Sequence, residues 1–256
     1  MATGARHFDS IASGYARTMA PSLRPVAAEV VRRARLRPGE SVLDIGTGTG
    51  NAAALARGEG RQVCGIDAAP AMLEIARAEI PDVTFEEMDF TALRFHDASF
   101  DVVLAVHALL FADDERAALA EWRRVTRPGG RLSLSVPGPT DVTPTAIYAE
   151  IYARHGIDTS GRYPTPPSLA ELAHGAGWNA VEVAADPTTA IVLPDDDAFR
   201  VWRGIGSRGA ATAHYTAEQH RALTDEMLAV TPRAPDGSLR IPFGAIYLSA
   251  RREDGG

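Results

Sequence analysis

The segment VLDIGTGTG, residues 42–50, constrains the fold of this chain more than any other. It places three glycines, at positions 46, 48 and 50, directly after a short apolar run that contains one aspartate, Asp44. A strand that runs into a glycine-rich turn and then a helix brings backbone N–H groups to the C-terminal edge of a parallel sheet, where such folds bind ligands. The segment therefore predicts a ligand held against main chain.

The surrounding sequence has the pattern of an α/β sheet. Short β-rich runs alternate with helical patterns over residues 41–136, which is typical of parallel strands joined by crossover helices. The expected strands are SVLDIG, QVCGID, VTFEEMD, FDVVLAVH and RLSLSVP, followed later by NAVEVAA from 179 and GAIYLSARR from 244. We expect a Rossmann-like, doubly wound, mostly parallel seven-stranded sheet with helices on both faces. RPGG, residues 127–130, is expected to form a turn after the helix ERAALAEWRRVT.

Composition and charge exclude several classes of function. The net charge of -7 argues against binding nucleic acid, which needs a basic face. All 26 basic residues are arginine, so Schiff-base and P-loop lysines are excluded. Cys64 is the only cysteine, which rules out an intramolecular disulfide. The chain shows neither a signal peptide nor an apolar run long enough to span a membrane, so we expect a cytoplasmic protein without membrane contact.

Acidic residues at the strand ends indicate the kind of ligand. The dinucleotide fingerprint G-x-G-x-x-G would need a glycine at position 51, which is Asn51, and the pattern here is D-x-G-x-G-x-G. Asp44 would repel a pyrophosphate but attract a ligand with an ammonium and a sulfonium group. Asp67 ends the second strand, where a carboxylate can accept hydrogen bonds from both ribose hydroxyls. Asp89 and Phe90 close the third strand, next to the expected position of an adenine.

Two of these carboxylates also have a purely structural interpretation. Asp67 could cap the helix that begins near Pro70, and Asp89 in DFTAL could cap another helix.

Several motifs together resemble the class I S-adenosylmethionine-dependent methyltransferases, especially the small-molecule branch that includes the ubiquinone and menaquinone biosynthesis enzymes. The resemblance covers residues 8–136 and is weak beyond them. It is carried by FDSIASGY, VLDIGTGTG, GIDAAPAML, MDF, FDVVLAVHALLFADD and RVTRPGGRLSLS.

The resemblance implies S-adenosylmethionine as cofactor and S-adenosylhomocysteine as product. Asp44 with the backbone of Gly46 and Gly48 would hold the methionine part, and Met72 would pack on the adenine. The complete predicted cofactor site is Tyr15, Asp44, Gly46, Thr47, Gly48, Asp67, Ala68, Met72, Asp89, Phe90 and Val106. Tyr15 could equally be an ordinary packing residue of the N-terminal segment, which in relatives folds over the cofactor.

The resemblance also predicts how one domain, residues 1–256, is organised. Residues 1–40 would form N-terminal lid helices and residues 41–136 the cofactor-binding core. Residues 137–243 would form an irregular, proline-rich acceptor cap with one core strand near 179–185, and residues 244–252 the last strand. Two departures from the family leave the polarity of the acceptor pocket open: Ala16 replaces a frequent aspartate, and Leu110-Phe111 replaces a frequent His-His pair.

His107 is the best candidate for a catalytic residue. It follows the apolar strand VVLAV at the C-terminal edge, where the reactive methyl group would point, and histidine is a suitable base near neutral pH. The alternative is a histidine that shapes the pocket or bonds a neighbouring loop. Weaker candidates for the acceptor pocket in the cap are His155, Tyr163, Trp202 and His214.

No metal site is predicted. The seven histidines are dispersed and form no H-x-x-x-H or Cys/His cluster. The acidic run from Asp195 to Asp197 resembles a chelator, but three successive carboxylates do not share a face, and a solvated helix start explains them better.

Three functions compete at this point. The first is methyl transfer to an O, N or C atom of a small molecule, neutral or cationic given the acidic chain, in secondary-metabolite or quinone-type biosynthesis. The second is binding of S-adenosylmethionine without methyl transfer, in a rearrangement or cyclisation catalyst or a regulator. The third, a nicotinamide dehydrogenase, leaves Asp44 unexplained. The protein would be a monomer or homodimer.

Overall fold

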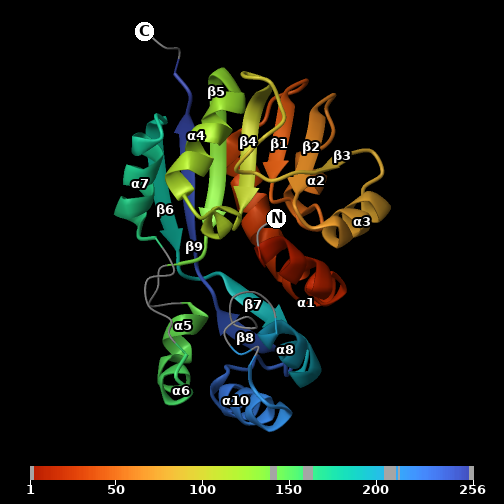
Figure 1. The fold of residues 1–256 in the computed structure, drawn as a ribbon, viewed down its shortest axis with the longest axis vertical. Helices are drawn as coiled ribbons and strands as arrows, with labels where there is room; N and C mark the ends of the chain where they lie inside the picture. Colours follow the sequence, from red (N-terminus) through yellow and green to blue (C-terminus); the bar gives the residue numbers. More distant parts are fainter. Residues whose placement is uncertain (1–2, 139–142, 158–163, 205–211, 213, 254–256) are drawn as a thin grey trace.

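The computed structural model describes residues 3–138, 143–157, 164–204, 212 and 214–253. Its main feature is a seven-stranded sheet with the strand order β3-β2-β1-β4-β5-β9-β6. The strands from β3 to β5 run parallel, whereas β9 pairs antiparallel with both β5 and β6. The predicted α/β fold with a mostly parallel seven-stranded sheet is confirmed (Figure 1).

Except for the beginning of β5, the strands of this sheet lie close to where the sequence predicted them. They are β1 (Ser41–Ile45), β2 (Gln62–Asp67), β3 (Thr84–Glu87), β4 (Phe100–Val106), β5 (Thr126–Val136), β6 (Asn179–Asp186) and β9 (Ala245–Arg251). The helices that surround it are α1 (Thr3–Ala34), α2 (Asn51–Ala56), α3 (Pro70–Glu79), α4 (Glu115–Val125) and α7 (Pro166–Gly175), with a 3-10 turn η1 (Leu109–Phe111) after β4.

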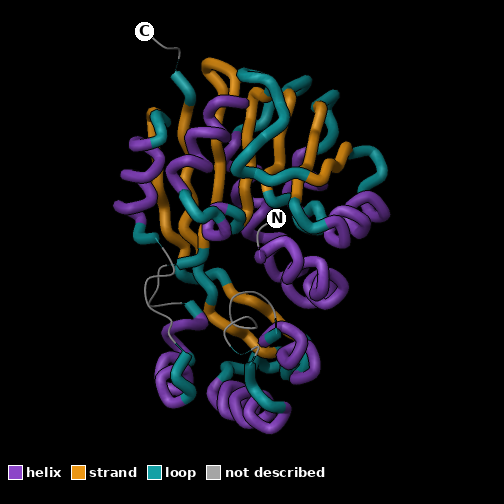
Figure 2. The backbone as a smooth tube through the Cα atoms, viewed as in Figure 1, coloured by secondary structure: helices purple, strands orange, loops and turns teal. Residues whose placement is uncertain are grey.

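Alternation of apolar side chains along the strands produces two cores. Val42 packs on the face that α1, α2 and α3 cover, while its neighbours Leu43 and Ile45 pack on the face covered by α4 and α7. The same alternation separates Val102 and Leu104 from their neighbours in β4. Because both faces are buried, the strands read as nearly continuous apolar runs. Figure 2 shows helices on both sides of the sheet.

The beginning of β5 differs from the prediction. Residues 127–130 were expected to form a turn, but they lie within β5, at an irregularity in its pairing with β4 between Phe100 and Val102. Gly129 there has a φ of 75°, and its N–H donates to the carbonyl of Arg252. Residues 127–130 therefore form the irregular beginning of a strand instead of a free turn, because they pair with the C-terminal segment.

The N-terminal region forms one long helix, α1, with Pro21 and Pro25 inside it. Its C-terminal half packs on the sheet, where Ser133 Oγ on β5 donates to the carbonyl of Val30 at 2.8 Å. Near the prolines, Ser22 Oγ donates to the carbonyl of Val192 and accepts from its N–H. Helix α1 thus connects the sheet to the rest of the molecule.

The remaining elements form a second layer beyond the C-terminal ends of the parallel strands (Figure 1). They are α5 (Pro144–Ile147), α6 (Ala149–Arg154), α8 (Asp196–Arg203), α10 (Ala217–Val230) and the antiparallel pair β7 (Ala190–Leu193) and β8 (Leu239–Pro242). We call these elements the cap. The segment around β7 was expected to be a proline-rich connector; pairing with β8, far along the chain, makes it a strand instead.

None of the helices in the described ranges is both long and apolar enough to cross a membrane.

Candidate cofactor and acceptor site

The glycine loop after β1 has the backbone that its sequence requires. Gly46, Gly48 and Gly50 have φ values of 61°, 56° and 88°, which favour glycine. A Cβ at Gly46 would lie 2.7 Å from the Cβ of Ala108, and one at Gly50 would collide with side chains at the end of α3 and on β3. At Gly48 the nearest atom is Tyr15 Cε1, 4.0 Å away. Packing therefore requires glycine at positions 46 and 50, while a side chain at position 48 would only touch the ring of Tyr15.

Asp44 is buried beneath this loop, with 1% of its surface exposed. Its Oδ2 accepts hydrogen bonds from Thr47 Oγ1 at 2.6 Å and from the backbone N–H of Ala53 at 3.0 Å. Burial raises the pKa of Asp44 to about 7, although these two hydrogen bonds lower it, and the charge of Asp67 adds to the increase. A nearby cation would favour the ionised carboxylate.

Asp67 connects the ends of two neighbouring strands. Its Oδ2 accepts from the N–H of Gly48 at 2.8 Å, and its Oδ1 accepts from the N–H of Ala69 at 3.0 Å. Burial raises its pKa, while the hydrogen bonds to backbone N–H groups lower it. Helix α3 begins at Pro70 and has no side-chain cap, so Asp67 does not act as its N-cap.

The N-terminal part of α1 lies against the loop at the start of α3. Met72 is 1% exposed and packs with Ala12 and Ala69, with Phe8 and Tyr15 at the border of the same cluster. Burial raises the pKa of the Tyr15 hydroxyl, and the charge of Asp67 contributes. Tyr15 therefore lies close to the glycine loop and Asp67, and its role above the cofactor stays a prediction.

Two contacts that sequence analysis missed hold this part of α1 in position. Asp9 Oδ1 accepts from the N–H of Ala71 at 2.9 Å. The ring of Phe8 meets Phe111 edge to face, with 5.1 Å between centroids. Both Phe8 and Asp9 belong to FDSIASGY, but their partners lie more than sixty residues away, and no local pattern points to them. Phe111, which replaces a frequent family histidine, thus gives the start of α1 an apolar contact with the segment after β4.

The third predicted strand end is built differently. Asp89 is exposed, and its Oδ1 accepts from the N–H and the hydroxyl of Thr91, which lowers its pKa. The structure assigns no helix to residues 89–93, so Asp89 closes a local turn. The ring of Phe90 packs edge to face on Trp122, whose Nε1–H donates to the Phe90 carbonyl. Its aromatic face thus belongs to the core beneath α4.

Ala68 and Val106 are half-buried at the ends of β2 and β4. Because β1 pairs with both of these strands, they border the glycine loop on its two sides.

His107 follows β4 and has an unusual backbone, with a φ of 54°. Left-handed backbone is uncommon outside glycine and is found at functional sites more often than elsewhere. Its N–H donates to the carbonyl of Ser135, its Nδ1 lies 3.3 Å from Ser135 Oγ, and its ring packs on Phe243. Burial lowers the pKa of His107 to about 4, so the ring is neutral at neutral pH.

The other ring nitrogen of His107, Nε2, is buried and makes no hydrogen bond to any residue that the structure describes. A buried polar atom without a partner is uncommon in folded proteins and can mark a catalytic position. Ser135 and Phe243, which orient the ring, come from β5 and from the segment between β8 and β9, so sequence analysis could not have associated them with His107.

The weaker candidates in the cap lie apart from this site. Trp202 is buried in the apolar core of the cap, and His155 Nε2 lies 3.0 Å from Glu226 Oε1. His214 is exposed and packs edge to face on Tyr215. Tyr163 lies outside the described residues.

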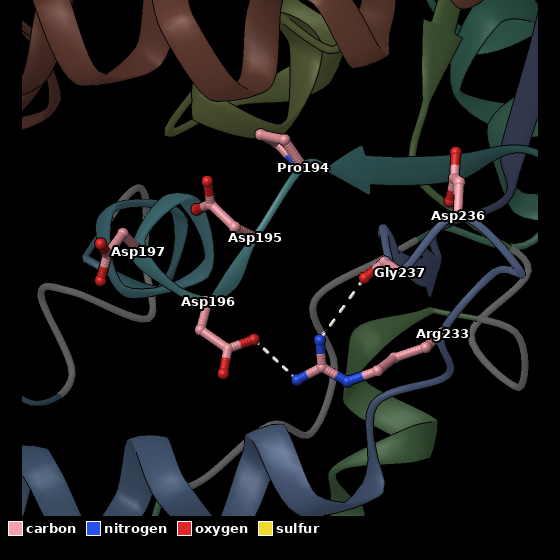
Figure 3. Close-up of a pocket in the computed structure, with 7 residues that line it drawn as sticks. All are labelled: Pro194, Asp195, Asp196, Asp197, Arg233, Asp236 and Gly237. Carbon is pink, nitrogen blue, oxygen red and sulfur yellow. Dashed lines mark hydrogen bonds and ion pairs between the residues drawn. The ribbon is translucent and has the colours of Figure 1, made fainter.

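The acidic run borders an open hollow at the start of α8 (Figure 3). Asp195 is the N-cap of α8 and accepts from the N–H of Ala198, while Asp196 pairs with Arg233 and Asp197 with Arg200. Each carboxylate thus has its own partner. No cluster of potential metal ligands occurs among the residues that the structure describes.

Comparison with known proteins identifies the family. Residues 43–134 match the family described as "Methyltransferase domain". Demethylmenaquinone methyltransferase from Beutenbergia cavernae is 35% identical over 163 residues, which cover 57% of this chain and 68% of that protein. An O-methyltransferase from Pyrenophora dematioidea is 37% identical over 114 residues, 42% of this chain and 43% of that protein. The solved [4+2]-cyclase SpnF superposes with a TM-score of 0.60 at 20% identity, covering 91% of this chain and 82% of that one.

The chain belongs to the class I S-adenosylmethionine-dependent methyltransferases of the small-molecule type. S-adenosylmethionine is its cofactor and methyl transfer its activity. The residues described above fit this cofactor: the loop presents the backbone of Gly48 beneath Tyr15 without a side chain, and the buried carboxyl of Asp44 would ionise in contact with a cation.

Proposed function

We propose that the protein methylates an O, N or C atom of a small molecule in quinone-type or secondary-metabolite biosynthesis. The observation that carries the proposal is the meeting of the glycine loop, Asp67 and His107 at neighbouring ends of β1, β2 and β4. Cofactor residues and a potential base thus lie at one sheet edge, facing the cap. The similarity to a demethylmenaquinone methyltransferase and to an O-methyltransferase supports this class of acceptor.

In the proposed site, Asp44 and the backbone of Gly46, Thr47 and Gly48 hold the methionine part of the cofactor, and Asp67 holds the ribose. Tyr15, Ala68, Met72, Val106 and the Asp89-Phe90 turn surround the adenosine. The cofactor supplies an electrophilic methyl group on a positively charged sulfur. The chain aligns the acceptor with that group and excludes water, which accounts for much of the acceleration in such reactions.

His107 is the proposed general base. It is neutral at neutral pH, because burial lowers its pKa to about 4, and Nε2 is its free acceptor. With such a low pKa it is a weak base, which suits an acceptor hydroxyl whose proton becomes strongly acidic as the new carbon–oxygen bond forms. Ser135 and Phe243 hold the ring in position.

Calorimetry with S-adenosylmethionine, S-adenosylhomocysteine and NAD tests the cofactor site. Wild type is expected to bind the first two and not NAD, and an Asp67→Ala variant to lose that affinity. Mass spectrometry of the products after incubation with a panel of phenols and reduced quinones then tests methyl transfer. A mass gain of one methyl group supports the proposal. A rearranged product of unchanged mass would instead support a rearrangement or cyclisation catalyst, and the [4+2]-cyclase SpnF has a similar fold.

A further inference from the structure

Arg203, on the last turn of α8, is a buried charge with no carboxylate beside it. Only 6% of its surface is exposed, and no ion pair joins it to any carboxylate in the described part of the chain. Its guanidinium contacts Thr212 Oγ1, at 3.5 Å, and His220 Nδ1. Arginine is almost never this deeply buried without a partner, because removing its charge from water is costly.

The surroundings of Arg203 contribute hydroxyl groups and an imidazole that the guanidinium keeps from gaining a second positive charge. Tyr152 on α6 and Tyr215 lie near enough to favour the charged guanidinium. The pKa of His220 on α10 is lowered by burial and by the charges of Arg203 and His214. These residues come from α6, α8, α10 and the segment before α10, and helix α10 contacts both α6 and α8 in the cap (Figure 1).

The acid that the structure pairs on α10 does not neutralise this group. Glu226 on α10 pairs with Arg154 and His155 instead. Arg203 also does not serve the end of its own helix, because its two hydrogen bonds to described residues go to Thr212 and His220 rather than to the last carbonyls of α8. The fold therefore holds a buried guanidinium in the cap whose hydrogen-bond partners among the described residues, Thr212 and His220, are both uncharged acceptors.

We propose that Arg203 anchors an oxyanion subsite, which binds a carboxylate or phosphate group of the methyl acceptor. The proposal rests on the proposed function for its ligand and makes the acceptor an acidic small molecule. It replaces the neutral or cationic acceptor that the net charge suggested, since the local charge decides what the cap binds. Trp202, beside Arg203, and Phe243, which packs on His107, belong to one continuous apolar cluster. This cluster runs from the sheet into the cap and connects the side of the cap that holds Arg203 with the side that faces His107.

The test uses three probes of similar shape: benzoate, phenyl phosphate and benzamide. Calorimetry at fixed ionic strength compares wild type with Arg203→Gln and with Arg200→Gln. Arg200 lies on the same helix, but its side chain is 51% exposed and pairs with Asp197. Wild type and Arg200→Gln are expected to bind benzoate or phenyl phosphate and not benzamide, and the preferred anion identifies the group. Arg203→Gln is expected to weaken that binding by about tenfold or more, the loss of one charge-assisted contact.

Two further variants exclude an internal partner. Asp141 and Asp158 lie outside the described residues, so Asp141→Asn and Asp158→Asn are measured together with Arg203→Gln by thermal unfolding. If Arg203 serves an anionic ligand, Arg203→Gln keeps or raises the melting temperature and both aspartate variants still bind the anion. A fall in melting temperature shared by Arg203→Gln and one aspartate variant would overturn the proposal, because it would identify a structural ion pair.

A parallel titration with S-adenosylhomocysteine separates the two proposals. Binding of S-adenosylhomocysteine without binding of either anion overturns the subsite and leaves the proposed function intact. Binding of an anion without binding of S-adenosylhomocysteine would overturn the proposed function and leave an anion site at Arg203.

Discussion

The carboxylate of Asp67 accepts a hydrogen bond from the backbone N–H of Gly48, 2.8 Å away, and so ties the end of β2 to the loop after β1. The same carboxylate is the proposed partner of the cofactor ribose. In the proposed site, one side chain would thus both shape the glycine loop and contact the ligand that the loop holds.

Replacing Asp67 by Asn is expected to weaken S-adenosylhomocysteine binding by about tenfold or more, since a charged acceptor of two ribose hydrogen bonds is lost. The matched control is Asp82→Asn, whose carboxylate is exposed and pairs with Arg57. Calorimetry measures both affinities. Equal affinities in the two variants would contradict the assigned role of Asp67.

Asp44 is expected to couple cofactor binding to proton release. Its pKa is about 7 in the folded protein and about 4 in an unfolded chain. The folded state therefore holds more protons between these values, and the free energy of unfolding falls as pH rises through that window. A sulfonium ligand favours the ionised carboxylate, so affinity for S-adenosylmethionine should rise from about pH 6 to pH 8.

Calorimetry in two buffers with different ionisation enthalpies measures how many protons are released when the cofactor binds. The measurement is made on the wild type and on Asp44→Asn. Asp44→Asn should abolish the release and flatten the dependence of unfolding free energy on pH, as measured with urea. An undiminished proton release in this variant would assign the titration to another group.

His107→Asn is expected to lower kcat by about a hundredfold or more, the usual contribution of a general base. Asparagine tolerates left-handed backbone better than most residues, so the fold should persist, and affinity for S-adenosylhomocysteine should stay within about twofold. The pKa of His107 is lowered to about 4, so the wild-type rate should not respond to this group above about pH 5.5. If kcat of the wild type instead changes with pH near 6.5, and this change is absent in His107→Asn, His107 titrates as a solvated histidine and the lowered pKa is contradicted.

Gly46→Ala is expected to destabilise the protein by about 2 kcal/mol or more, because left-handed strain and a clash with Ala108 add together. Gly39→Ala is the control: its φ of 76° is just as unusual, but nothing lies within 4 Å of the added Cβ. Urea denaturation of both variants isolates the cost of the clash. Equal destabilisation would mean that the loop moves away from Ala108 without cost.

The sheet could be predicted from sequence because its signals are local. Val42 and Leu43 alternate between two cores, and Gly46 interrupts the strand within a few residues. The orientation of His107 was unpredictable because it depends on Ser135 and Phe243, which arrive from distant elements. Strand β7 was missed for the same reason: it is four residues long and forms only against β8.

The pairing of β6 with β9 has a consequence for how this enzyme can change. Asp186, the last residue of β6, lies opposite Ala245, the first of β9. The chain between these two residues, which includes α8 with Arg203, therefore begins and ends at neighbouring positions on the same edge of the sheet. Such an excursion can be exchanged for another without shifting a strand, so a descendant of this protein can acquire a different acceptor while its cofactor loop stays as it is.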